Sequence, residues 1–216
     1  MKKLALLFLT AALCAGFSAS AQTSKEILDK LSAKAKGYKS ITADFSSTLV
    51  DKKNNKNVKQ EGTIKIKGAK YALNLADYVV ISDNKTVWSY DKKANSCSID
   101  DIADVKNGSF DPSQMFTIWE KDFKHEMKNA SANMDGVAAY EINLYPIETK
   151  GKAYHTITMF VDKAKMEVRK IIVKTREGAE ITYKVKTFVT SNDVPDTDFT
   201  FNKSKYPGVE MIDNRL

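Results

Sequence analysis

The fold is decided between residues 41 and 67, where the chain reads ITADFSSTLVDKKNNKNVKQEGTIKIK. Apolar and polar side chains alternate through the first part of this stretch, and the alternation resumes from Val58 to Ile66. A period of two is typical of a strand with one face in the core and one face in water. Residues 51–57 between the two runs are Asp, Asn and Lys, which favour a turn. The stretch therefore predicts a hairpin of two long antiparallel strands.

The alternation continues on both sides of the middle of the chain. In the series before the middle of the chain, each break carries Asp, Asn, Gly or Lys, and none is long enough for a crossover helix, so neighbouring strands are expected to be antiparallel. The further strands are expected at residues 71–75, 79–82, 86–90, 96–99, 123–127, 137–145, 154–161, 167–174 and 179–189. A total of about eleven strands exceeds what a flat open sheet holds comfortably, so we expect a mainly β fold with a strongly curved antiparallel sheet or a barrel.

Two helices are expected beside the strands. Thr23 and Glu26 have the spacing of a capping box at the start of an amphipathic helix, and Gly37 is expected to close that helix in a left-handed conformation. Asp111 and Pro112 suit the cap and first position of a second, short helix. Its apolar side is expected to carry Met115, Phe116 and Trp119, with Ile118 at its edge. From the residues alone, this helix is most simply a plug at one end of the core.

The first 21 residues predict a secretory signal. Two lysines precede a nearly unbroken apolar run, and small residues suit cleavage near Ala21. A lipid anchor on Cys14 is the alternative, but Leu13 stands where such signals carry a small residue. We therefore expect an exported protein that begins at Gln22 and forms a single domain, residues 22–216.

The charge and cysteine content bound the possible partners. The formal net charge is +7, and it falls to +5 without the two lysines of the signal. The lysines are scattered and no arginine-rich cluster occurs, so nucleic acid is not expected as a partner. The charge of a mildly basic exported protein either serves solubility alone or attracts anionic membrane surfaces or acidic partners. Without the signal one cysteine remains, Cys97, so no intramolecular disulfide is expected.

Candidate catalytic residues are few. His125 and His155 each lie in a strand pattern without a second ligand at metal-binding spacing. The acidic cluster at residues 100–104 lacks the glycine and terminal Glu of a calcium loop, which indicates a solvated turn. Cys97 has no neighbour that would lower its pKa and is expected to be buried and inert. The sequence therefore predicts a binding protein that is not an enzyme and uses no metal or cofactor.

The alternation also predicts an apolar face. In the last long strand Thr182, Lys184 and Lys186 are expected to point outward, opposite to Ile181, Tyr183 and Val185. The residues expected on the apolar face are Phe45, Tyr71, Leu73, Leu75, Trp88, Tyr140, Ile142, Leu144 and Met159. A curved sheet lined in this way encloses either a packed core or an apolar cavity, and the residues alone do not separate the two.

An ordered set of segments resembles a known family. The segments are Glu61–Ile64, Val80–Tyr90, the pair Asp111–Pro112 before the apolar helix, Asp198–Phe201 and Tyr206–Glu210. Together with the signal and the strand pattern, they resemble the family of periplasmic outer-membrane lipoprotein carrier proteins, LolA, over nearly all of the mature chain. The resemblance implies an open β half-barrel covered by short helices, with a hydrophobic cavity between the sheet and a lid.

The resemblance also implies a function. A member of this family is a periplasmic chaperone that binds the acyl chains of lipoproteins and carries them from the inner to the outer membrane. The nine apolar residues above would then line the cavity, and Met115, Phe116, Ile118 and Trp119 would belong to the lid. The implied partners are lipoproteins, an ATP-driven inner-membrane transporter that releases them and an outer-membrane acceptor, with the carrier a monomer. Two alternatives remain: an envelope lipid-binding or sensing module of the same fold, and an interaction domain whose barrel is filled.

One departure from the family pattern concerns the lid. Members usually carry an Arg with a nearby Pro in the strand region after the first hairpin, where the Arg fastens the closed lid through backbone carbonyls. Residues 67–73 contain neither, and the first arginine of the chain is Arg169. The contacts that hold the lid closed in this chain therefore differ from those of the family pattern.

Overall fold

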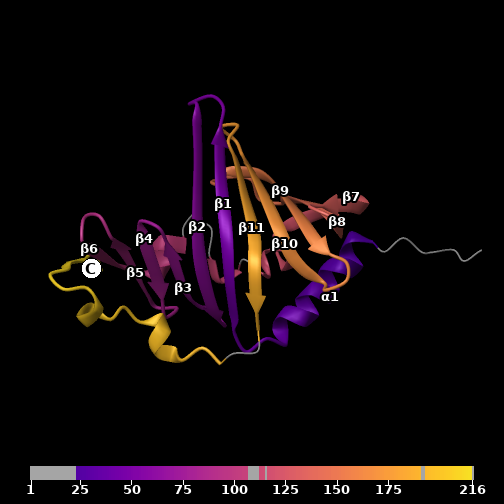
Figure 1. The fold of residues 1–216 in the computed structure, drawn as a ribbon. Helices are drawn as coiled ribbons and strands as arrows, with labels where there is room; N and C mark the ends of the chain where they lie inside the picture. Colours follow the sequence, from indigo (N-terminus) through magenta and orange to yellow (C-terminus); the bar gives the residue numbers. More distant parts are fainter. Residues whose placement is uncertain (1–22, 107–111, 115, 191–192, 216) are drawn as a thin grey trace, which may run out of the picture.

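The computed structural model describes residues 23–106, 112–114, 116–190 and 193–215. The expected signal at residues 1–21 lies outside them, as do Asp111 and Met115 of the expected second helix. The described residues form one twelve-stranded sheet with an N-terminal helix and short helical turns (Figure 1). Within these ranges, no helix has the length and apolar character that a membrane span requires.

Each of the eleven expected strands is present, and a twelfth follows them. The first series is β1 (Ile41–Asp51), β2 (Lys56–Lys67), β3 (Lys70–Leu75), β4 (Tyr78–Ser82), β5 (Thr86–Asp91) and β6 (Ser96–Asp101). The second series is β7 (Phe123–Met134), β8 (Val137–Pro146), β9 (Tyr154–Asp162), β10 (Glu167–Thr175) and β11 (Glu180–Val189). The twelfth strand, β12 (Glu210–Asp213), lies close to the C-terminus.

The strand order shows how the two series become one sheet. It runs β12-β6-β5-β4-β3-β2-β1-β11-β10-β9-β8-β7, so each series is a meander and the pairing of β1 with β11 joins them. All pairs are antiparallel except β12 with β6, which are parallel. The sheet curves strongly and its edge strands β12 and β7 remain apart (Figure 1). The expectation of a curved, mainly β fold is therefore confirmed, as an open sheet rather than a closed barrel.

The inner face of the sheet carries the main core. Helix α1 (Ser24–Lys36) places its apolar stripe, Ile27, Leu28 and Leu31, against it. The buried strand residues of this core are Ile41, Ala43, Phe45, Ile64, Ile66, Tyr71, Ile142, Leu144, Ile157, Met159, Val161, Val168 and Ile171. We call this side of the sheet the inner face.

A second, smaller core lies on the opposite side, the outer face. It consists of Val79, Ile81, Tyr90 and Cys97 from β4 to β6, together with Phe201 and Val209. The last two belong to residues 193–215, the C-terminal segment, which contains two short 3-10 helices, η3 (Asp196–Phe199) and η4 (Lys203–Lys205), and then β12. The chain thus folds back over the outer face of its own first meander.

Helix α1 confirms part of the expected capping. The Thr23 Oγ1 accepts a hydrogen bond from the Glu26 N–H (3.2 Å), and the Glu26 carboxylate accepts one from the Thr23 N–H (3.1 Å), which is a capping box. The left-handed closure at Gly37 is wrong, because Gly37 has φ −76° and ψ −12°. Its N–H instead bonds the Lys34 carbonyl in a tight last turn (3.1 Å), which needs no left-handed residue.

The expected second helix is also wrong as a single element. Its described part forms two separate 3-10 turns, η1 (Pro112–Gln114) and η2 (Ile118–Glu120). Thr117 between them has φ −142° and ψ 5°, which interrupts the helical backbone. The other short helix, α2 (Ile102–Lys106), follows β6 directly and was not expected. Phe116 and Trp119 have the spacing of one helical turn, so the sequence pattern suggested one helix. The pattern does not reveal the non-helical backbone of Thr117 between them.

Gly62 in β2 allows an aromatic ring to lie across the hairpin. It pairs with Phe45 of β1. A Cβ atom at Gly62 would lie 2.8 Å from the Asn74 carbonyl oxygen and 2.9 Å from the Phe45 ring. These distances are shorter than van der Waals contact and one of the atoms belongs to the backbone, so the space above this glycine is occupied.

We expect Gly62→Ala to lower the free energy of unfolding by about 1–3 kcal/mol, because the added methyl group overpacks the hairpin. Urea denaturation followed by circular dichroism measures the change. Gly37→Ala is the control: at this right-handed residue outside the sheet the added Cβ comes no closer than 3.3 Å to the Lys34 carbonyl oxygen, so the loss of stability should be clearly smaller than for Gly62→Ala. Equal stability of Gly62→Ala and the wild type would contradict the packing described here.

Cys97 is fully buried in the outer core. Burial, with a smaller contribution from the charge of Asp100, raises the pKa of the Cys97 thiol to about 11. The sequence-based expectation of a buried thiol is therefore confirmed.

In a protein that begins at Gln22, we expect Cys97 to resist labelling by an aromatic disulfide reagent at pH 8. At a pKa of about 11, roughly one thiol in a thousand is ionised at that pH, and the core shields it further. The absorbance of the released thiolate measures the reaction, and labelling should become rapid and complete in urea. Rapid labelling of the folded protein would show that the outer core opens readily.

Candidate functional site

The candidate site is the apolar inner face beneath its helical cover. Eight of the nine side chains expected there do lie on this face: Phe45, Tyr71, Leu73, Leu75, Tyr140, Ile142, Leu144 and Met159. Cross-strand pairing explains their common orientation, because residues opposite each other share a face. Ile142 pairs with Met159, and Leu73 pairs with Ile64. Residues far apart in sequence thus form one continuous apolar surface.

Burial varies across this surface. Ile142, Leu144 and Met159 are fully buried, and Phe45 and Tyr71 nearly so. Leu73, Leu75 and Tyr140 are partly exposed and pack at the margin of the core. The inner face therefore has a closed centre and more open margins, at Leu73 and Leu75 of β3 and at Tyr140 of β8.

The cover consists of α1 and residues 116–120. Phe116 and Trp119 are each 5% exposed, and Ile118 packs beside them, partly buried. The Phe116 ring meets Phe188 of β11 edge to face, with 5.1 Å between ring centroids. Three of the four expected lid residues therefore lie over the inner face, and the fourth, Met115, lies outside the described residues.

Polar contacts join the two parts of the cover. The Trp119 Nε1 donates to the Ser32 Oγ (2.9 Å) and to the Leu28 carbonyl (3.2 Å), both in α1. Lys36 of α1 forms an ion pair with Glu120 (3.3 Å). The indole N–H thus fastens residues 116–120 to a backbone carbonyl of α1.

Further polar contacts join the cover to the sheet. Lys34 of α1 forms an ion pair with Glu167 (3.2 Å) at the start of β10 and donates to the Lys165 carbonyl. Burial opposes protonation of Lys34, but hydrogen bonding and the charge of Glu167 outweigh it and raise the Lys34 pKa. At the other end of α1, the Ser24 hydroxyl bonds His125 of β7 (2.9 Å). These contacts hold the cover in a chain that lacks the family arginine.

Little empty space remains around Phe116, between α1 and β11. The cavity bounded by Leu31, Tyr38, Phe116, Trp119 and Phe188 measures about 20 Å³. Such a volume holds about one water molecule and no acyl chain. In this conformation the side chains of the cover occupy the space that a ligand would need there.

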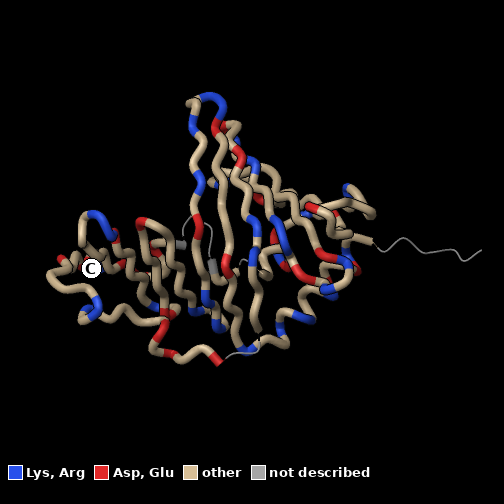
Figure 2. The backbone as a smooth tube through the Cα atoms, in the orientation of Figure 1, with Lys and Arg blue, Asp and Glu red and all other residues tan. Residues whose placement is uncertain are grey.

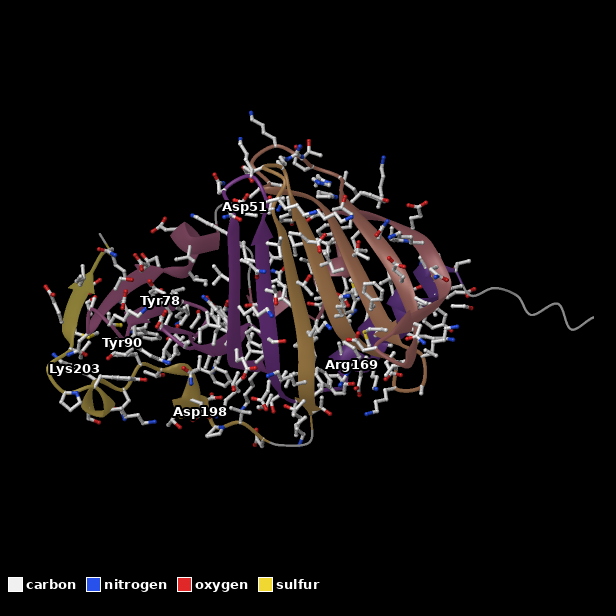
Figure 3. All side chains as sticks on the ribbon, turned by 45° about the horizontal axis from the view of Figure 1, so that its top comes forward. Asp51, Tyr78, Tyr90, Arg169, Asp198 and Lys203 are labelled. Carbon is white, nitrogen blue, oxygen red and sulfur yellow. The ribbon has the colours of Figure 1, made fainter. Side chains whose placement is uncertain are left out.

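Trp88 does not lie on the inner face, and its expected place there is wrong. It pairs with Ile81 of β4 and Ile99 of β6, and it packs against the outer core. Ser82 pairs with Tyr71 of the inner face and with Val87, so Val87 faces inward. Trp88, the next residue, therefore faces outward. Figure 3 shows Tyr90, which shares this face, at the same end of the sheet as Asp198 and Lys203 of the C-terminal segment. Since both faces of this hairpin are apolar, alternation alone did not distinguish them.

The remaining candidate residues take structural positions. His125 bonds Ser24, and His155 of β9 bonds Thr156 (2.8 Å). The acidic cluster at residues 100–104 lies at the end of β6 and in α2 rather than in a turn. Among the described residues, no group of three His, Cys, Asp or Glu side chains is placed to hold a metal ion. Charged residues of both signs are spread over the whole sheet, as the scattered lysines predicted (Figure 2).

Among the solved structures compared, the first of the three below shares the fold at low sequence identity, and the other two are less similar. An uncharacterized conserved protein from Thermus thermophilus is 9% identical, with 88% of this chain and 98% of that chain covered and a TM-score of 0.58. LppX, a lipoprotein of Mycobacterium tuberculosis, is 10% identical, with 80% and 100% covered and a TM-score of 0.47. A putative outer membrane lipoprotein-sorting protein domain from Vibrio parahaemolyticus is 12% identical, with 84% and 97% covered and a TM-score of 0.46.

Sequence comparison identifies the family. A search of curated proteins finds no match. The family model described as outer membrane lipoprotein carrier protein LolA matches residues 36–202, from the end of α1 through the second meander and into the C-terminal segment. A match over most of the chain, on an open curved sheet with a helical cover, shows that the chain belongs to the LolA family.

Proposed function

We propose that this protein is a periplasmic carrier that binds the acyl chains of lipoproteins on its inner face and takes them from the inner to the outer membrane. One observation carries the proposal: a continuous apolar surface lies beneath a cover held by side-chain packing and a few polar contacts. The family match supports it, and the expected signal at residues 1–21 supports export to the periplasm.

The proposed task answers a physical need. Burial of a methylene group is worth about 0.8 kcal/mol, so an acyl chain of roughly fifteen methylenes has an aqueous penalty near 12 kcal/mol. A lipoprotein carries more than one such chain and does not cross an aqueous compartment alone. An apolar surface that is covered when empty and exposed on demand meets this need.

Binding by this mechanism is non-covalent and requires the cover to move. Phe116 and Trp119 leave the inner face, and acyl chains take over their contacts with the strands. An ATP-driven transporter at the inner membrane loads the carrier, and an acceptor at the outer membrane receives the cargo. The direction of transport comes from differences in affinity. A partner that binds the loaded and the empty carrier equally well does not shift the equilibrium between them.

The direct test identifies the cargo. A photoreactive residue at position 119 is crosslinked in cells, and the protein is purified from the periplasm and analysed by mass spectrometry. Lipoproteins with their acyl chains should be recovered, and their absence together with the absence of any lipid would refute the proposal. Recovery of lipid without lipoprotein would favour an envelope lipid-binding or sensing module of the same fold. Envelope fractionation after depletion then decides, because only loss of a carrier leaves lipoproteins in the inner membrane.

We expect Leu75→Asp to weaken binding of the neutral probe N-phenyl-1-naphthylamine at least tenfold, because Leu75 belongs to the sheet and stays on the inner face when the cover opens, where a carboxylate carries a desolvation cost of several kcal/mol. Probe fluorescence measures affinity, and circular dichroism checks the fold. Ile147→Asp is the matched control, since the same charge enters at a side chain that is 61% exposed. Equal affinities of all three proteins, or no saturable binding to the wild type, would support a filled core without a ligand.

We expect Trp119→Phe to tighten binding of the same probe. The substitution keeps an aromatic ring but removes the two hydrogen bonds to α1, worth about 1–2 kcal/mol in total, so the open state becomes about 5–30 times more populated. Apparent affinity rises in proportion to that population. Trp88→Phe, on the outer face, should leave affinity unchanged. Equal affinity of Trp119→Phe and wild type would show that the indole contacts do not limit opening.

A further inference from the structure

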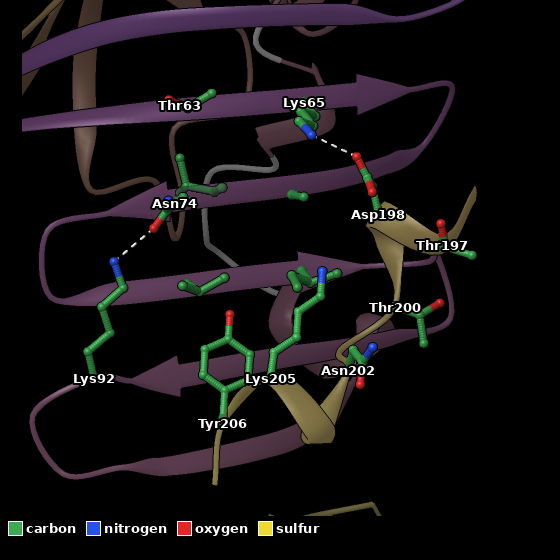
Figure 4. A pocket seen from close by; sticks show the side chains of 14 residues that line it. Thr63, Lys65, Asn74, Lys92, Thr197, Asp198, Thr200, Asn202, Lys205 and Tyr206 are labelled. Atoms are coloured by element: carbon green, nitrogen blue, oxygen red, sulfur yellow. Dashed lines mark hydrogen bonds and ion pairs between the residues drawn. The ribbon is translucent and has the colours of Figure 1, made fainter. Parts of the chain in front are cut away.

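A second cavity lies on the outer face, between the first meander and the C-terminal segment (Figure 4). This outer groove has a volume of about 450 Å³, within the range of small-molecule sites. It is lined by residues of β2, β3 and β4, by Lys92 after β5, and by residues 197–206. The sheet itself separates it from the inner face, so the proposed acyl-chain site does not account for it.

The walls of the outer groove are fixed at both ends. At one end Lys65 of β2 forms an ion pair with Asp198 of η3 (2.7 Å). At the other end the Tyr206 ring stacks on Phe201 (4.9 Å between ring centroids, interplanar angle 7°) and packs against Tyr90 (4.3 Å). The C-terminal segment is thus attached to the sheet on either side of the space, and the groove is a built feature of the fold.

The floor and the rim of the outer groove differ in polarity. Ala72, Val79 and Ile81 of the outer face form an apolar floor. Asn74, Thr200 and Asn202 form part of a polar rim. In Figure 4, the Lys205 side chain and the Tyr206 hydroxyl point from the C-terminal segment toward the part of the sheet that carries Asn74. A ligand in this space meets apolar surface below it and hydrogen-bond donors at its edge.

The charges that line the outer groove are not balanced. Three lysines face one aspartate, and that aspartate, Asp198, is already paired with Lys65. Lys92 is held by the Asn74 side chain (2.8 Å) and the Leu75 carbonyl, which are neutral acceptors. The backbone N–H of Lys205 donates to the Asn202 carbonyl (3.0 Å), but its ammonium group contacts no acceptor in the described parts of the chain. The groove therefore presents two ammonium groups without a counterion among those residues.

Neighbouring lysines on the same side of the sheet do not show this imbalance. Lys67 forms ion pairs with Asp193 (3.2 Å) and Asp196 (3.1 Å), and Lys70 pairs with Asp196 (2.9 Å). The C-terminal segment thus supplies carboxylates to Lys67 and Lys70 and none to Lys92 and Lys205. An anion from solution would supply the negative partner that Lys92 and Lys205 do not receive from the described residues.

We propose that the outer groove binds an amphiphilic anion, with a phosphate or carboxylate group between Lys92 and Lys205 and an apolar part on Ala72, Val79 and Ile81. The Tyr206 hydroxyl donates a further hydrogen bond to the anionic group. Burial, with smaller contributions from Tyr90 and Cys97, raises the pKa of Tyr206, which keeps this donor protonated. The proposal stands independently of the acyl-chain site, because the two surfaces lie on opposite faces of the sheet.

Isothermal titration calorimetry with octyl phosphate below its micelle concentration tests the proposal, with N-phenyl-1-naphthylamine present at saturation so that the inner face is already occupied. We expect one bound molecule per chain, much weaker binding of the neutral octyl glucoside, and affinity that falls as salt rises, because the lysines are accessible to counterions. Lys205→Gln should weaken octyl phosphate binding about tenfold. Lys203→Gln is the matched control: it removes the same charge from the same short helix, at a residue that does not line the groove.

Two further measurements separate the possible outcomes. Octyl phosphate binding should persist in Leu75→Asp, which damages only the inner face, so failure of the acyl-chain proposal leaves this one testable. Inorganic phosphate serves as a second probe: affinity well below that of octyl phosphate identifies a lipid-like anion, and equal affinity identifies a free anion in the same site. The proposal is overturned if Lys205→Gln binds octyl phosphate as tightly as wild type, or if Lys203→Gln weakens it equally.

Discussion

Strands β1 and β11 pair along most of their length and hold the two halves of the sheet together. This pairing joins residues that are distant in the chain, such as Asp44 and Thr187, which are 143 positions apart, and turns two separate meanders into one sheet. Asp44 reinforces the joint on the outer face, where it accepts hydrogen bonds from Thr63 of β2 and Thr187 of β11 (both 2.7 Å). On the inner face Phe45 lies between Gly62 and Val185. Without this junction the apolar residues of the two meanders would not form one surface.

Much of the fold was predictable because its signals are local. Every strand with five or more residues was expected from its period of two, and the capping box located the start of α1. Strand β12 was not expected, because it has only four residues. It joins the edge of the sheet by parallel pairing with β6, which is distant in sequence. The break at Thr117 likewise leaves no mark in the sequence pattern. Short elements placed by tertiary contacts therefore escape a reading based on periodicity.

Trp88 shows why most of the inner face could be predicted and one residue could not. For β1, β8 and β11, alternate positions are polar, so the apolar set identifies the inner face. In β4 and β5 both faces are apolar: Val80 packs toward the inner core, while Ile81 and Trp88 pack toward the outer core. The ambiguity disappears only when the cross-strand partners are known, since Leu73 pairs with Val80 and thereby fixes the face of each following residue. The outer core itself exists because a segment more than a hundred residues later covers it.

The two sides of the sheet select ligands by different forces. On the inner face the protein closes its own apolar surface with Phe116 and Trp119, which prevents a large exposed apolar patch in the empty state. That closure competes with any ligand, so affinity there depends on how much more apolar area the ligand buries than the cover does. On the outer face no such competition exists in the described groove, and affinity depends on two ammonium groups that salt screens. A ligand of the inner face should therefore respond to contacts within the cover and little to ionic strength, whereas a ligand of the outer groove should show the reverse.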